Sequence, residues 1–183
     1  MRFAGRHATV RRQTGDNAMT SSDNPETYTD ARGAAFCWMA VSEALEIVYG
    51  LAERNLPGGH DIAREAALAG ERAWQQEALN NLHHIVVNCE DELDGYAMPD
   101  AAGDWPDAVI AARRDDDPNR PSHAIRIALA MAEDAAIDPA ACARDVHLAD
   151  ECDRQQQAFD VTRDLLGTHA AALDAGFTAT RTP

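Results

Sequence analysis

The chain has 183 residues, with 31 acidic residues against 16 arginines and no lysine, so its formal net charge at pH 7 is −15. This length suits one domain with a core of its own, and no apolar run approaches the about 20 residues that a membrane-spanning helix needs. Such a negative surface repels phosphate groups and anionic lipids. We therefore expect no direct binding to nucleic acid and none to a membrane.

The first eighteen residues differ from the rest, because they hold four arginines and one acid. They lack the apolar stretch of a secretory signal. We predict that residues 1–23 form a disordered basic and polar arm. An early start codon, with Met19 as the true first residue, and an organelle-targeting peptide are the alternatives.

A long helix is expected next. Asn24-Pro25 is typical of a helix N-cap followed by proline at the first helical position, so this helix should begin near Asn24 or at Asp30. Leu56-Pro57 and the two glycines that follow should end it. Between these points apolar residues recur at helical spacing, at Cys37, Val41, Leu45, Val48 and Ala52.

A second long helix is expected from Asp61 to about Tyr96. Its apolar stripe comprises Trp74, Ala78, Leu82, Ile85, Cys89, Leu93 and Tyr96. Because the link between the two helices is short, we predict a long antiparallel αα-hairpin. Trp38 and Trp74 should fill its core.

After a loop from Met98 to Pro106, the pattern predicts a short helix over 107–114 and a third main helix capped by Ser122. Asp138-Pro139 should open a fourth that fades near Gly176. The fold class is therefore all-α, a bundle of about four main helices. Residues 24–176 form one domain with an acidic loop region at about 94–121, and 177–183 form a frayed tail.

Cysteine and serine chemistry gives no catalytic motif. The four cysteines (Cys37, Cys89, Cys142 and Cys152) form no C-x-x-C pair, so we expect reduced, small apolar side chains in a cytoplasmic protein. A dyad of Cys89 with His84 or His123 is the alternative to a core role for Cys89. No nucleophile-elbow serine is present, and without lysine neither a Walker loop nor a Schiff base can form.

Metal binding is a weaker hypothesis. The candidate ligands are His83 and His84 on the second helix, and His147 and Glu151, which lie four residues apart and therefore share one helix face. A di-iron bundle needs E-x-x-H pairs, and the chain has none. We therefore predict no metal and no cofactor, and keep a metal-binding enzyme or sensor as an alternative function.

The strongest functional signal is a dense run of carboxylates, ten of them between Glu90 and Asp117. A negative field of this kind attracts a basic partner and accelerates association. Trp105 lies within the run, and tryptophan is enriched among binding hot spots. The predicted partner-binding residues are Glu90, Asp91, Glu92, Asp94, Trp105, Asp115, Asp116 and Asp117.

These features lead to one expected function: a non-enzymatic, cytoplasmic, acidic helical module that engages a basic protein partner. An accessory or inhibitory protein of a mobile element or phage, whose carboxylates imitate nucleic-acid phosphates, is one specific form of it. Self-association as a structural homo-oligomer is the remaining alternative. No family resemblance supports any of these, so the expectation depends on charge alone.

Overall fold

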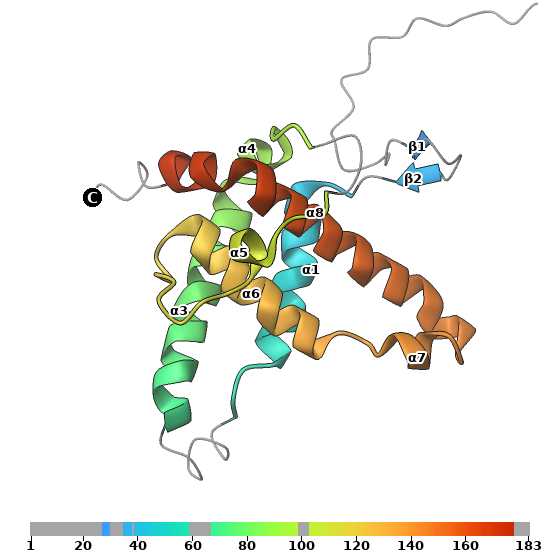
Figure 1. Ribbon diagram of the computed structural model, residues 1–183, viewed down its shortest axis with the longest axis horizontal. Helices are drawn as coiled ribbons and strands as arrows, with labels where there is room; N and C mark the ends of the chain where they lie inside the picture. Colours follow the sequence, from blue (N-terminus) through green and yellow to red (C-terminus); the bar gives the residue numbers. More distant parts are fainter. Residues whose placement is uncertain (1–26, 30–34, 38, 59–66, 99–102, 178–183) are drawn as a thin grey trace, which may run out of the picture.

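The computed structural model describes residues 27–29, 35–37, 39–58, 67–98 and 103–177. Apart from one small hairpin of strands, every element it describes is a helix (Figure 1). The elements are β1 (Thr27–Thr29), β2 (Ala35–Cys37), α1 (Val41–Arg54), α3 (Ala67–Asn88), α4 (Glu90–Asp94), α5 (Asp107–Ile110), α6 (Pro121–Ala135), α7 (Pro139–Cys142) and α8 (Val146–Gly176).

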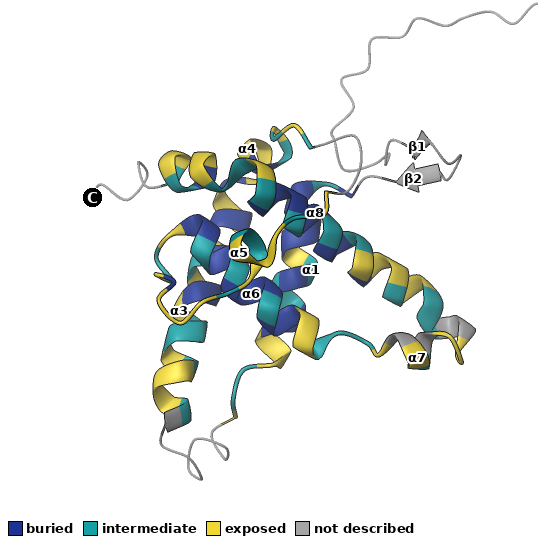
Figure 2. Cartoon of the chain, in the orientation of Figure 1, coloured by how far each residue is buried: buried dark blue, intermediate teal, exposed yellow. Residues whose placement is uncertain are grey.

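The four longest helices meet around one core. α1 contacts α3, α6 and α8, and α6 also contacts α3 and α8. Their facing surfaces are buried, whereas exposed residues lie mainly on the outer faces and on the ends of the helices (Figure 2). Leu45, Leu82, Ile125 and Leu165 are among the fully buried side chains of this core. The all-helical class is therefore confirmed. The predicted hairpin remains a prediction, because its link falls in 59–66, outside the described residues.

The start of the first helix was predicted wrongly. α1 begins at Val41, and β1 pairs antiparallel with β2 in the stretch where helix was expected, with Tyr28 opposite Phe36. From Val41 onward the predicted stripe is correct, since Leu45, Val48 and Ala52 are all buried. The predicted arm 1–23 and Trp38 lie outside the described residues.

The second helix is shorter than predicted. α3 ends at Asn88, Cys89 is non-helical, and the five-residue α4 ends at Asp94.

In the C-terminal region, Asp138 does accept a hydrogen bond from the Ala140 amide (2.9 Å), as the cap signature predicted. This helix, α7, stops at Cys142, and α8 begins separately at Val146.

Two helix N-termini are capped by acids from other helices. Asp94 of α4 accepts hydrogen bonds from the amide (2.9 Å) and hydroxyl (3.1 Å) of Ser42, in the first turn of α1. Asp174 of α8 accepts one from the amide of Ser122 (2.9 Å), in the first turn of α6. Ser122 is therefore a capped residue and not the predicted cap. Each contact satisfies an otherwise unpaired backbone N–H and places a negative charge at the positive end of a helix.

The cysteines are not all reduced. Cys152 is disulfide-bonded, which contradicts the expectation of four free thiols. Cys89 is free and buried between α3 and α4. Burial, and secondarily the charge of Glu92, raise the pKa of the Cys89 thiol, so it is a poor nucleophile at neutral pH.

Candidate functional site

The loop of residues 111–120, which we call the acidic loop, joins α5 to α6 and lies against α3. Three residues of α3 hold it. Trp74 donates its indole N–H to the carbonyl of Asp116 (2.9 Å), Asn81 donates to the carbonyl of Pro118 (2.8 Å), and Glu77 accepts from the side chain of Asn119 (2.8 Å). The loop is thus fixed along one side of α3.

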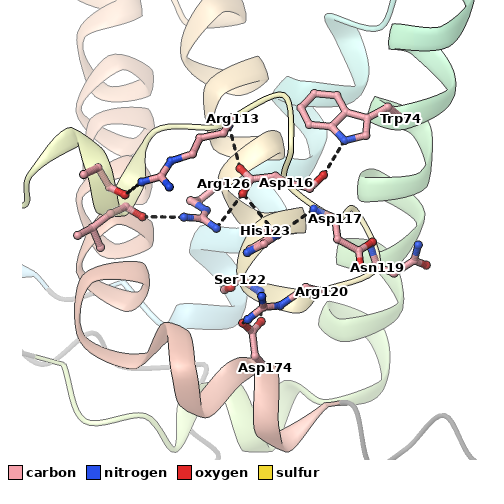
Figure 3. A network of polar contacts seen from close by, with 12 residues as sticks. Trp74, Arg113, Asp116, Asp117, Asn119, Arg120, Ser122, His123, Arg126 and Asp174 are labelled. Carbon is pink, nitrogen blue, oxygen red and sulfur yellow. Dashed lines mark hydrogen bonds and ion pairs between the residues drawn. The ribbon is translucent and has the colours of Figure 1, made fainter.

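A buried carboxylate organises this loop from within (Figure 3). Asp116 is 6% exposed. Its Oδ2 accepts the backbone amide of Arg113 (2.8 Å), and its Oδ1 accepts Nη2 of Arg126 from α6 (2.9 Å). The Asp116 carboxylate is therefore occupied by internal partners. We had predicted it to face a partner protein, but its burial and pairing leave it no surface to present.

His123, in the first turn of α6, belongs to the same network as Asp116 and Arg126. Its Nδ1 accepts the backbone amide of Asp117 (2.9 Å) and lies 3.4 Å from Oδ1 of Asp116. The pKa of His123 is lowered, mainly by burial; Arg126 and Arg120 lower it further, while Asp116 opposes them. His123 is consequently neutral at neutral pH.

Trp105 is half-buried and packs on α8 instead of standing free among the acids. Its indole N–H donates to Oδ1 of Asp164 on α8 (2.7 Å), which also accepts the amide of Gly103 (2.8 Å). The ring lies against Gly167, where a Cβ atom would overlap it. Trp105 thus anchors the segment before α5 onto α8. Oδ2 of Asp164 is buried and has no hydrogen-bond partner among the described residues.

The remaining predicted acids are exposed. Glu90, Asp91 and Glu92, which we call the α4 acids, occupy the first turn of α4, and Asp115 and Asp117 project from the acidic loop. None of the five takes part in an ion pair with any residue that the structure describes. Asp94, by contrast, is the cap of α1.

These exposed acids form two surfaces and not one. The carbonyl of Asp116 contacts Trp74 near the start of α3, whereas the α4 acids follow its last residue, Asn88. At 1.5 Å per residue, Trp74 and Asn88 are about 21 Å apart along the helix. Figure 1 shows α4 beyond the end of α3. One small partner surface could not contact both groups at close range.

The candidate metal ligands whose side chains the structure describes do not come together. His83 stacks on Tyr49 (ring centroids 5.3 Å apart), the ring of His84 contacts Asn88, and Glu151 accepts from Gln155. The side chain of His147 lies outside the described part of the chain. Within that part, no group of three or more His, Cys, Asp or Glu residues has a geometry that could hold a metal ion.

The predicted dyad of Cys89 with His84 or His123 has no support in the described contacts. His84 bonds to Asn88 and His123 to Asp117, and the Cys89 thiol is buried. Among the described helices, none combines the length and the apolar character that crossing a membrane requires.

Comparisons with known proteins add no identity. The chain matches no family model, and neither the curated proteins nor the solved structures include a significant match to it. Function must therefore be inferred from the arrangement of its own side chains.

The central residues of this site were not singled out in the sequence. Asp116 was counted as one of three consecutive exposed aspartates, and Arg126, Asp164 and Asp174 were not selected at all. The helical stripe of α6 gave one usable signal. Arg126 follows Ile125 and precedes Ile127, both fully buried, so a charged residue there needs a nearby acid.

Proposed function

We propose that this chain is a non-enzymatic, acidic helical interaction module that binds a basic protein partner through the α4 acids. The proposed architecture is a bundle of four main helices that begins with a helical hairpin, and the proposed location is the cytoplasm. Disulfides are rare in that compartment, so the bond at Cys152 counts against this location.

One observation carries the proposal: the α4 acids are exposed and have no ion pair among the described residues. The arginines near other acids are used internally, as in Arg126 with Asp116, Arg154 with Glu43, and Arg163 with Glu133. Three adjacent carboxylates without a counter-charge produce a local negative field that a basic surface would neutralise. The acidic loop, with Asp115 and Asp117, offers a second and smaller field.

Charge reversal tests the proposal. The α4 variant replaces Glu90, Asp91 and Glu92 by arginine. A matched control replaces three exposed acids elsewhere that also have no ion pair in the described structure, namely Glu46, Asp150 and Asp153. Each variant moves the formal charge from −15 to −9, so a difference between them reports position and not total charge.

Each protein is immobilised and exposed to an extract of its host cell at low salt, and bound proteins are identified by mass spectrometry. We expect a basic protein that the wild type and the control retain and the α4 variant loses, with binding that weakens as salt rises. If the α4 variant and the wild type retain the same basic proteins in equal amounts, the α4 acids have no role in binding. A double variant, Asp115→Arg with Asp117→Arg, tests the acidic loop separately.

The other predicted functions remain without a specific observation in their favour. A metal-dependent bundle is tested by metal analysis of the purified protein, and self-association by light scattering. Val87, at 62% exposed, is the one large apolar side chain that stands out from the described surface. Mimicry of nucleic-acid phosphates is tested by asking whether DNA competes with the chain for the captured protein.

A further inference from the structure

Besides the pair of Asp116 with Arg126, a hydrogen bond whose direction is fixed fastens the acidic loop to α6. The amide of Asp117 lies 2.9 Å from Nδ1 of His123. A backbone amide can only donate, so Nδ1 must be the acceptor and carries no proton. The imidazole is therefore neutral, with its hydrogen on Nε2.

A different acceptor faces the same nitrogen. Oδ1 of Asp116 lies 3.4 Å from Nδ1 of His123, and it is held in place by Arg126 (2.9 Å). If Nδ1 gains a proton it becomes a donor, and it can then no longer accept from Asp117. Its nearest acceptor becomes the Asp116 carboxylate. Figure 3 shows Asp116 and Asp117 on the same side of the acidic loop, both beside His123. One protonation event would thus exchange the partner of His123.

We propose that His123 is a pH-operated latch for the acidic loop, closed when its imidazole is neutral and opened when Nδ1 is protonated. In the open state the imidazolium bonds to Asp116, and the Asp117 amide is released to solvent. The side chain of His123 is 16% exposed, so a proton can reach it without unfolding. The consequence for binding, a changed presentation of Asp115 and Asp117, rests on the proposed function.

The charged groups that face His123 come from three elements and oppose one another, so burial sets the direction of the response. Asp116 faces it from the acidic loop, Arg126 from α6, Arg120 from the N-cap of α6, and Asp174 from α8. From α3, Glu77 reaches the loop only through the side chain of Asn119. Burial is the largest influence and lowers the pKa of His123 from 6.5, so the latch is closed at pH 6.5 and above and opens as the pH falls below that value.

Nuclear magnetic resonance of the full chain tests the latch directly. The wild type is titrated from neutral to acidic pH while the ring of His123 and the amide of Asp117 are followed. We expect both to shift with one shared midpoint below pH 6.5. If the ring titrates and the Asp117 amide does not move with it, the latch does not exist.

Two variants make the test specific. His123→Asn retains an acceptor that does not titrate, so the Asp117 amide should hold its bonded position through the same range. His123→Phe has no acceptor, so that amide should take its open position at every pH. An Asp117 shift in His123→Asn equal to that of the wild type would overturn the proposal. These readouts need no partner, so they can fail while the charge-reversal result stands, and the reverse also holds.

Discussion

Replacing Gly167 by alanine should destabilise the protein, while the same change at Gly50 should stabilise it. Inside a helix, alanine is favoured over glycine by about 1 kcal/mol. At Gly50, in α1, nothing lies within 4 Å of an added Cβ, so we expect that variant to gain roughly 0.5–1 kcal/mol. At Gly167, in α8, the added methyl group would overlap the ring of Trp105.

The clash at Gly167 leaves two outcomes, and both cost more than the helix gains. If Trp105 stays, overpacking costs roughly 1–3 kcal/mol. If it leaves, Oδ1 of Asp164 keeps the amide of Gly103 but loses the indole N–H that lies 2.7 Å away, and a lost hydrogen bond to a carboxylate costs roughly 1.5–3 kcal/mol in addition to the lost packing. We therefore expect Gly167→Ala to lower the free energy of unfolding by roughly 1–3 kcal/mol.

Urea unfolding of the wild type and both variants measures these differences. Gly70→Ala in α3 is a second control, because its Cβ would also meet nothing within 4 Å. The indole N–H resonance of Trp105 should shift in Gly167→Ala and stay in place in the controls. If Gly167→Ala is as stable as Gly50→Ala and that resonance is unchanged, Trp105 does not pack on Gly167 and the anchoring described above is wrong.

Two further predictions concern acids that have partners within the protein. Asp116→Ala leaves the guanidinium of Arg126 without its carboxylate, which should lower the free energy of unfolding in urea by roughly 3–5 kcal/mol. Asp115 is exposed, so Asp115→Ala should change that free energy by no more than about 0.5 kcal/mol. Similar losses in the two variants would contradict the pair of Asp116 with Arg126. Burial raises the pKa of Asp174, but the hydrogen bonds from Ser122, together with the hydrogen bond and the charge of Arg120, outweigh it and the net pKa is lowered from 3.8. The stabilisation by Asp174 is therefore present above pH 3.8 and lost as the pH falls below that value. The acid unfolding transition should consequently shift in Asp174→Asn. An unchanged transition would count against Asp174 as the cap of α6.

Local sequence signals predicted those features of the helices that depend on residues close together in the chain. The apolar stripe of α1, the stop at Leu56-Pro57 and the cap at Asp138 each depend on residues within a few positions of one another. Propensity, proline geometry and capping act at that range, so they can be read from sequence. The predicted start of α1 is wrong because Asn24-Pro25, although cap-like, precedes residues that pair as strands.

The contacts that position the site could not be predicted in the same way. Asp94 caps α1 at Ser42, and Asp174 caps α6 at Ser122; in each case 52 residues separate the pair. Nothing in the local sequence of an acid states which distant helix will need a hydrogen-bond acceptor. That need arises only when packing brings a helix end beside it.

The same reasoning changes how the acidic composition should be interpreted. Asp94 satisfies a helix end, Asp116 neutralises Arg126, and Asp164 holds an indole, so part of the negative charge is used in folding. An acid that accepts two or more internal hydrogen bonds cannot be offered to a partner without losing stability. Binding must then depend on the acids that the fold leaves without a counter-charge. Such acids also occur elsewhere on the described surface, as at Glu46, Asp150 and Asp153, but on α4 three of them stand in consecutive positions. Position, more than total charge, should decide which basic surface can dock.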